Sequence, residues 1–197
     1  MSRRAQSAEH TRVLILRAAL ERFTADGYAK ATVNDIARAA GVVVATVYTS
    51  VGGKPVLLEQ LVRQGVEDTE VERTTAAILA AGTGREVIDL LADGTGLTYR
   101  RHEAVIGLLL DTAAYEPFAR RLLAAGNRAY REALAVAARR LAALDALADG
   151  VDVDRATDVL WYLFGIHSWP RLLRDATWTG PEADAWLRET AALRLLR

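Results

Sequence analysis

The hydrophobic positions of the chain recur at intervals of three and four residues along most of its length. This spacing places apolar side chains on one face of a helix, and it is clear at Val13, Leu16, Leu20 and Phe23. No stretch of any length alternates between apolar and polar residues in the way that a half-buried strand does. The pattern therefore predicts an all-α protein.

Glycine, proline and capping residues indicate where these helices begin and end. The glycines within residues 93–96 predict a break in one helix, and Pro170 should kink or stop another, because proline lacks a backbone N–H. The expected helices cover residues 9–25, 33–40, 43–50, 55–80, 85–92, 97–115, 117–147, 152–169 and 182–196.

Residues 32–54 contain two short predicted helices joined by a tight turn. Thr32 can cap the first helix by accepting a hydrogen bond from a free backbone N–H. Gly41 permits the left-handed backbone in which many helices end. The second helix, from about Val43 to Ser50, packs inward through Val47 and leaves its other faces open. Any two-helix hairpin shares this pattern, but so does a helix-turn-helix, whose second helix enters the DNA major groove.

The residue identities from about Ile15 to Leu58 resemble the DNA-binding domain of the tetracycline-repressor (TetR) family. The resemblance covers about the first 60 residues and implies an N-terminal three-helix helix-turn-helix DNA-binding domain over residues 9–54. It also implies a C-terminal helical effector-binding and dimerisation domain over residues 55–197. The matching residues, in the order and spacing of the family, are Ala18, Ala19, Phe23, Gly27, Tyr28, Thr32, Val33, Asp35, Ile36, Ala37, Ala40, Gly41, Val42, Thr46, Val47, Tyr48, Lys54, Leu57 and Leu58.

The resemblance implies that the expected DNA contacts divide by type. Contacts to phosphate position a protein without reading the base sequence, and the candidates are Thr32, Tyr48 and Lys54. The base-reading candidates offer methyl and hydroxyl groups but no arginine for a bidentate guanine contact, and they are Val44, Ala45, Thr46 and Thr49. Direct contacts to bases should therefore contribute little specificity, and DNA shape should contribute more. Simple solvent exposure is the alternative role for the lysine.

Two positions depart from the family pattern. Val43 stands where a serine is common at the start of the recognition helix, so a capping oxygen is missing. Val51 stands where a large aromatic residue, usually phenylalanine, packs beneath that helix. These changes place the affinity and rigidity of the domain in question more than its fold.

Charge is distributed unevenly in a chain whose net charge is +0. Residues 1–54 hold eight basic and four acidic residues, a balance of +4, and the remainder has a balance of −4. A basic N-terminal segment suits a DNA-binding head on a neutral body, although chance would also produce so modest an excess. The only charged residues that precede the first expected helix are Arg3 and Arg4. They could contact phosphates or the DNA minor groove, or they could simply belong to a loose charged terminus.

Composition excludes several other classes of protein. With 51% hydrophobic and 25% charged residues the chain resembles an ordinary globular protein. It has no cysteine for a disulfide, a thiolate nucleophile or a zinc site. The N-terminus is too polar for a signal peptide, and no apolar run is long enough to span a bilayer. These features predict a cytoplasmic protein with no membrane association.

The sequence contains no recognisable constellation of catalytic or metal-binding residues. Its three histidines are far apart, and no HExxH or nucleophile-elbow pattern is present. Gly94-Thr95-Gly96 is a poor phosphate loop, because no strand precedes it and no lysine follows at the proper distance. We therefore expect no enzyme activity, no cofactor and no metal.

The C-terminal part contains residues suited to a small-molecule site and to an interface between subunits. The TetR resemblance implies a pocket for a small apolar effector, for which the candidates are Asn127, Trp161, Phe164 and His167. Each of these residues is equally compatible with a place in the core or at an interface. The resemblance also implies a homodimer held by the final helices, which carry more apolar residues than one terminal helix can bury: Trp186, Leu187, Leu193 and Leu196.

These observations predict a DNA-binding transcriptional regulator of the TetR type. The expected partners are a double-stranded DNA operator, a second copy of the chain and the effector, whose binding should release the repressor from a palindromic operator. One alternative is a dimeric helical protein that binds apolar ligands and has weakened or lost DNA binding through the changes at Val43 and Val51. A helical enzyme is the other alternative, and it would need a compact set of titratable groups.

Overall fold

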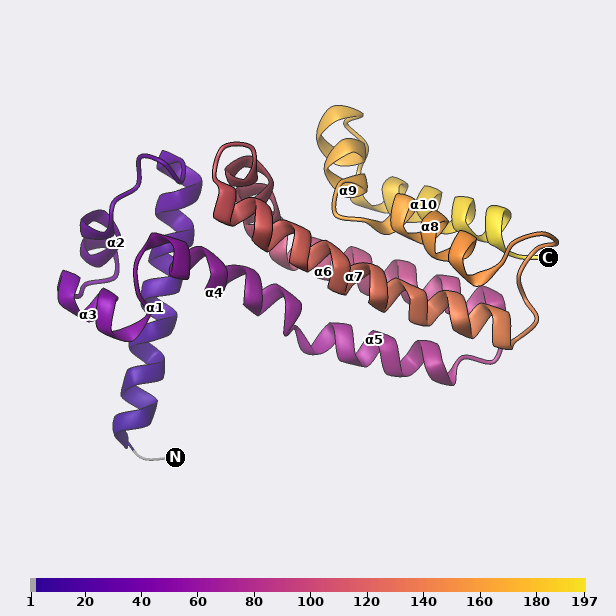
Figure 1. Ribbon diagram of the computed structural model, residues 1–197, viewed down its shortest axis with the longest axis horizontal. Helices are drawn as coiled ribbons and strands as arrows, with labels where there is room; N and C mark the ends of the chain where they lie inside the picture. Colours follow the sequence, from indigo (N-terminus) through magenta and orange to yellow (C-terminus); the bar gives the residue numbers. More distant parts are fainter. Residues whose placement is uncertain (1–2) are drawn as a thin grey trace. The chain divides into compact units, whose positions relative to one another are not determined.

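The computed structural model describes residues 3–197 and is helical along most of this range (Figure 1). The all-α prediction is confirmed, and an isolated antiparallel bridge joins Leu147 to Leu196. The helices are α1 (Arg3–Asp26), α2 (Val33–Ala39), α3 (Val44–Ser50), α4 (Lys54–Val66), α5 (Thr69–Ala80), α6 (Gly84–Ala113), α7 (Pro117–Ala143), α8 (Val153–Phe164), α9 (Ser168–Pro170), the π-helix η1 (Arg171–Asp175) and α10 (Gly180–Leu195).

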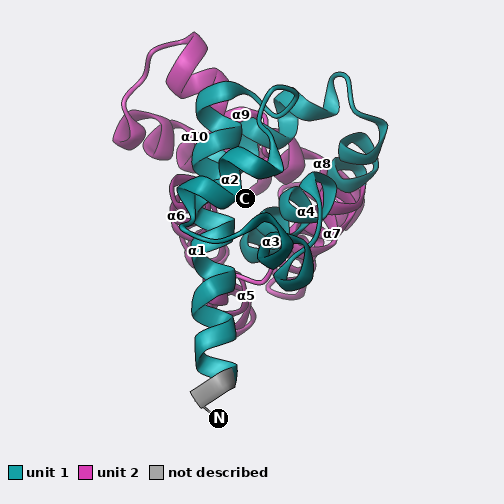
Figure 2. Ribbon diagram, turned by 90° about the vertical axis from the view of Figure 1, so that its left-hand side faces the viewer, with its two compact units in different colours: residues 1–66, 102–124 teal, residues 67–101, 125–197 magenta. Residues whose placement is uncertain are grey.

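The chain divides into two compact units (Figure 2). The first unit combines α1 to α4 with residues 102–124, and the second combines residues 67–101 with residues 125–197. The long helices α6 and α7 therefore contribute to both. The functional domains expected over residues 9–54 and 55–197 stay a prediction.

The first unit is built around apolar side chains from each of its segments. The core position predicted for Val13 is wrong, because this side chain is 50% exposed whereas Ile15 is fully buried. Figure 2 shows the N-terminal turns of α1 extending beyond the other helices of this unit. The buried core includes Ile15, Leu16, Ala19, Phe23, Tyr28, Ile36, Val47, Leu57, Leu58, Leu108 and Leu109.

The continuous helix predicted from residue 55 to residue 80 is instead two helices. The chain leaves helical geometry at Asp68, whose carboxylate accepts a hydrogen bond from the Glu70 N–H at 2.8 Å and so caps α5. Arg101 on α6 pairs with the same carboxylate at 3.2 Å. Apolar spacing continues across this junction, so periodicity alone did not reveal the break.

The break predicted at residues 93–96 does not occur, because α6 runs through these residues without interruption. Their glycines serve close packing. A Cβ atom at Gly94 would overlap the Thr74 side chain of α5, and one at Gly96 would lie 3.2 Å from the Trp169 ring. The neighbouring segments of the second unit thus approach α6 where it lacks side chains.

The helix predicted to run to Pro170 ends six residues earlier, at Phe164. Gly165 follows in extended geometry, where a Cβ atom would overlap the Trp161 carbonyl oxygen. Pro170 lies in the short α9, and helical structure continues past it into η1. Proline is tolerated there because the first turn of a helix does not use its backbone N–H groups.

Helix α1 begins at Arg3, six residues before its expected start, and other helix boundaries differ more modestly from the predictions. Helix α7 ends at Ala143, and Asp145 then adopts a positive φ of 51°. Helix α10 begins at Gly180 behind a capping box, in which Thr179 and Glu182 each accept a hydrogen bond from the other's backbone N–H. Within the second unit, α8 and α10 lie side by side (Figure 1).

Candidate nucleic-acid interface

Helix α2 begins as its capping residue predicts. The Thr32 hydroxyl accepts a hydrogen bond from the Asp35 N–H at 3.1 Å and donates one to the Asp35 carboxylate at 2.5 Å. The helix ends at Ala39, and Gly41 follows shortly after with a φ of +69°, in the left-handed region that favours glycine. The turn is closed by a 3.0 Å hydrogen bond from the Val42 N–H to the Ala37 carbonyl. These local bonds determine where α3 starts.

Helix α3 has one buried face and one open face. Val47 is fully buried against α1 and α2, whereas Tyr48 is 55% exposed. Ala45 and Thr49 are also exposed, and Val44 and Thr46 are half-buried. The Thr49 hydroxyl donates to the Ala45 carbonyl at 2.9 Å, so its oxygen remains available to accept a hydrogen bond.

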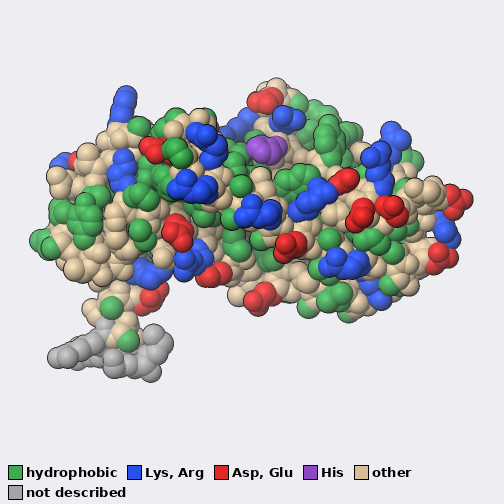
Figure 3. All heavy atoms as spheres, viewed as in Figure 1, with side chains coloured by type: hydrophobic (Ala, Val, Ile, Leu, Met, Phe, Trp, Pro, Cys, Tyr) green, Lys and Arg blue, Asp and Glu red, His purple; other side chains and the backbone are tan. Residues whose placement is uncertain are grey.

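The open face of α3 carries no charged side chain. In Figure 3 the surface over α3 is accordingly hydrophobic or uncharged, with Lys and Arg side chains around it. The division of the candidates into base contacts and phosphate contacts stays a prediction.

The two departures at Val43 and Val51 have visible structural consequences. Val43 occupies the N-cap of α3 and makes no side-chain hydrogen bond to the helix. Val51 is half-buried and packs against the core of the first unit. The chain then turns at Gly52, which has a φ of +127°. Helix α3 is thus held mainly by Val47 and its backbone, not by a polar cap.

Lys54 begins α4 and has partners within the protein. Its Nζ atom donates to the Ala29 carbonyl at 3.2 Å and lies 4.6 Å from the centroid of the Tyr28 ring. Burial lowers the pKa of Lys54, and the negative charge of Glu116 opposes this shift. Sequence reasoning selected the lysine but missed Ala29, because a backbone acceptor leaves no signal in the sequence.

The four candidates for an effector site lie on α7, on α8 and in the segment that follows α8. Trp161 on α8 contacts the Tyr130 ring edge-on at 5.9 Å, and the Phe164 carbonyl accepts a 2.8 Å hydrogen bond from the Tyr130 hydroxyl. Asn127 is half-buried on α7. His167 is exposed and lies beyond the end of α8, so its predicted place on the same helix as Trp161 and Phe164 is wrong. Tyr130 was not among the candidates.

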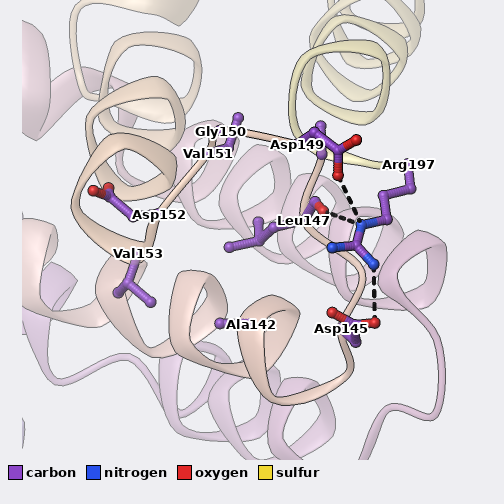
Figure 4. Close-up of a pocket in the computed structure, with 10 residues that line it drawn as sticks. Ala142, Asp145, Leu147, Asp149, Gly150, Val151, Asp152, Val153 and Arg197 are labelled. Atoms are coloured by element: carbon purple, nitrogen blue, oxygen red, sulfur yellow. Dashed lines mark hydrogen bonds and ion pairs between the residues drawn. The ribbon is translucent and has the colours of Figure 1, made fainter.

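A cavity of about 350 Å³ lies in the second unit at the α7–α8 loop (Figure 4). Arg197 lines this cavity, and its guanidinium donates a hydrogen bond to the Leu147 carbonyl at 2.8 Å and forms an ion pair with Asp145 at 2.9 Å. None of the four effector candidates lines this cavity. Its lining combines apolar residues with the charged groups of Arg197, Asp145 and Asp149, which pair with one another.

Within residues 3–197 there is neither a cluster of metal-binding side chains nor a helix suited to a membrane. These residues include no group of three or more His, Asp or Glu side chains placed to hold a metal ion. Within the same range, no helix combines the length and apolar composition needed to cross a membrane.

Removal of the Thr32 hydroxyl tests the role of the cap. We expect Thr32→Ala to lower the free energy of unfolding by about 1 kcal/mol, because an N–H at the start of α2 loses its acceptor. Thr24→Ala, which alters an exposed threonine of α1, is the matched control and should change stability by less than about 0.5 kcal/mol. Urea denaturation of both variants measures the difference, and equal midpoints would contradict the capping role.

The same hydroxyl affects how stability depends on pH. Its hydrogen bond, with help from Arg38, holds the pKa of Asp35 below the ordinary value. A carboxyl with a lowered pKa in the folded state stabilises the protein above its unfolded pKa, near pH 4, and this contribution is lost as the pH falls through the folded pKa. Thr32→Ala should therefore lose less stability than the parent protein between about pH 4 and pH 2. Acid titration of unfolding measures this.

The N-terminal helices of this chain resemble a known protein family in sequence. Residues 15–61 match the sequence model of bacterial regulatory proteins of the tetR family. The match to a family of regulators confirms the prediction of a regulator and not an enzyme. No curated protein matches the chain.

Solved structures extend the comparison along nearly the whole chain. NalD, the secondary repressor of the MexAB-OprM multidrug efflux pump in Pseudomonas aeruginosa, gives a TM-score of 0.78 at 22% identity, with 98% of both chains covered. The SmeT–triclosan complex gives 0.79 at 20% identity, covering 95% of this chain and 92% of SmeT. A protein from Saccharomonospora viridis in complex with choline gives 0.75 at 20% identity, covering 96% of this chain and 99% of that one. The fold is therefore shared over almost its full length.

Proposed function

Since residues 15–61 match the sequence model of the tetR family of bacterial regulatory proteins, we propose that the chain is a DNA-binding regulator that represses transcription from a palindromic operator. The open face of α3 carries the proposal. Val47 anchors this helix in the core, while Tyr48 and Thr49 point outward from a face without charge. A short helix with one face buried in the core and the opposite face exposed is suited to insertion into the major groove.

Within this proposal the DNA contacts keep their predicted types. Thr32, Tyr48 and Lys54 meet phosphates, and the base edges are met by Val44, Ala45, Thr46 and Thr49. The methyl groups of α3 favour thymine, and its hydroxyls accept mixed partners. Since these contacts discriminate weakly, the shape and deformability of the operator should contribute much of the specificity.

A homodimer would supply two such helices for a two-fold operator. Apolar side chains on the last helices support this arrangement: Tyr162 on α8 is 75% exposed, and Leu193 on α10 is 79% exposed. Because α8 and α10 lie side by side, a second copy can cover both. Trp186, also on α10, is 44% exposed and extends the same apolar character.

Leu193→Glu tests the dimer. We expect the variant to dissociate at least about tenfold more readily than the parent, because a charge would be buried at a site that apolar contact should fill. Leu79→Glu alters a leucine on α5 that is 55% exposed, and this control should leave dissociation unchanged. Sedimentation equilibrium measures both. A monomeric parent protein, or equal dissociation of the two variants, would contradict the proposed interface.

We further propose that a small apolar effector releases the protein from DNA. Asn127, Trp161, Phe164 and His167 remain the candidates, with the aromatic group around Tyr130 as the best-supported part. Two proteins that share this fold form complexes with small molecules, SmeT with triclosan and the Saccharomonospora viridis protein with choline, which supports a small-molecule ligand. Such a ligand can shift DNA affinity only by its own difference in affinity for two conformations of the dimer.

The decisive test is selection of operator DNA from random duplexes, followed by binding at two salt concentrations. We expect tight binding that weakens steeply with salt, because neutralised phosphates release counterions. Tyr48→Ala and Lys54→Ala should weaken binding, whereas Leu79→Ala, which alters an exposed leucine of α5, should not. Failure to enrich any sequence would overturn the proposal.

The uncapped start of α3 at Val43 favours one alternative function. A dimer that binds apolar ligands but has lost DNA binding would have the same fold and the same interface. It would show no salt-dependent preference for any duplex, and Val43→Ser would be expected to restore some affinity by supplying a capping oxygen.

A further inference from the structure

Lys54 is held by the turn between α1 and α2, although it belongs to α4. One N–H of its ammonium goes to the Ala29 carbonyl at 3.2 Å, and the nitrogen lies 4.6 Å from the centre of the Tyr28 ring. A lysine ammonium has three donors in all, and this side chain is only partly buried. The geometry therefore restrains the ammonium while leaving donors for an acceptor outside the protein.

The Tyr28 ring is itself fixed by aromatic neighbours. Its centroid lies 5.0 Å from that of Phe23 on α1 and 5.7 Å from that of Phe118 in the first turn of α7. Burial, with the negative charge of Glu116, raises the pKa of Tyr28 to about 12. The phenol therefore stays neutral, and its π face attracts a cation.

These contacts connect two separate segments of the first unit to the positive charge of Lys54. Residues 102–124 supply Phe118 and Glu116, and the N-terminal helices supply Tyr28 and Lys54. Glu116 acts on the charge of the lysine, and Phe118 acts on the ring beside it. A displacement of the first turn of α7 would reach the lysine through the ring.

We propose that Tyr28 is a positioning residue for DNA binding: its ring and the Ala29 carbonyl aim the Lys54 ammonium at an operator phosphate, and Phe118 holds the ring in place. This inference rests on the proposed DNA-binding function. It assigns to a buried tyrosine a role beyond packing, and it makes the α6–α7 turn a point from which phosphate affinity is controlled.

The position of Lys54 can be measured without DNA, because the chain has only two lysines, Lys30 and Lys54. Labelling of lysine side chains with ¹³C should give two sets of ε-methylene signals, one of them shifted upfield by the Tyr28 ring current. The variant Lys30→Arg removes the Lys30 signals, so the signals that remain belong to Lys54. Tyr28→Phe should preserve the shift, Tyr28→Leu should abolish it, and Phe118→Leu should reduce it. Two unshifted lysine signals in the parent protein would overturn the proposal.

The effect on DNA binding is measured as the salt dependence of operator affinity. Lys54→Met should reduce the slope by about one phosphate contact per protomer. Tyr28→Leu should reduce it equally, Tyr28→Phe should leave it unchanged, and Lys54→Met with Tyr28→Leu should be no worse than either alone. Circular dichroism of each variant checks that it remains folded, and Phe118→Leu serves as a second variant that keeps the tyrosine.

The possible failures are distinguishable. A normal slope in folded Tyr28→Leu, together with a reduced slope in Lys54→Met, would mean that the lysine needs no positioning and would overturn this inference alone. A parent protein without salt-dependent operator binding would overturn the proposed function, and the positioning role with it.

Discussion

Replacement of Phe164 by alanine should lower the free energy of unfolding by about 3–5 kcal/mol. This side chain is 1% exposed at the end of α8, so truncation removes buried apolar surface and leaves a cavity that helical neighbours cannot fully close. The 2.8 Å bond from the Tyr130 hydroxyl to the Phe164 carbonyl involves the backbone and should survive the substitution. The loss therefore reports on the packing of the ring.

His167→Ala is the matched control, since this residue was an effector candidate on the same grounds as Phe164. Its side chain is exposed, and we expect a change of less than about 0.5 kcal/mol. Urea unfolding at one fixed protomer concentration measures both variants, because the proposed dimer would make stability depend on concentration. A loss below about 1 kcal/mol in Phe164→Ala would mean that the ring faces a pre-existing space, which would favour an effector site there.

Gly94→Ala should destabilise the protein by about 1–3 kcal/mol, although alanine is the better helix former. The added Cβ atom would overlap the side chain of Thr74 where α5 packs on α6. One of the two helices must move, and the surrounding core moves with it. Thermal and urea unfolding measure the loss.

The chain contains a matched control for this substitution. Gly126 lies inside α7 and a Cβ atom there would meet nothing within 4 Å, so Gly126→Ala should stabilise the protein by about 0.5–1 kcal/mol. Thr74→Ala combined with Gly94→Ala should recover part of the loss, because it removes the hydroxyl and methyl groups that the new Cβ atom meets. Equal effects of the two glycine substitutions would show that close packing is not the reason for Gly94.

The helix-turn-helix is the part that the sequence by itself determined most fully. Thr32 caps α2, and Gly41 adopts the left-handed backbone just after the helix, both as predicted. Each of these signals acts within about one helical turn through a hydrogen bond or a backbone angle, so a neighbouring stretch of residues is sufficient to reveal it. The all-α fold follows in the same way from the spacing of apolar residues.

The tertiary structure decided the features that depend on segments far apart in the chain. Gly94 marks a close approach to Thr74 and not a helix end. Gly165 ends α8 ahead of Pro170, which separates His167 from Phe164. The partners of Lys54 come from Ala29 and, through Tyr28, from Phe118. A glycine or an aromatic residue has the same local signature in a turn, a core or a site. Only the volumes and distances of the groups packed around it determine which of these it is.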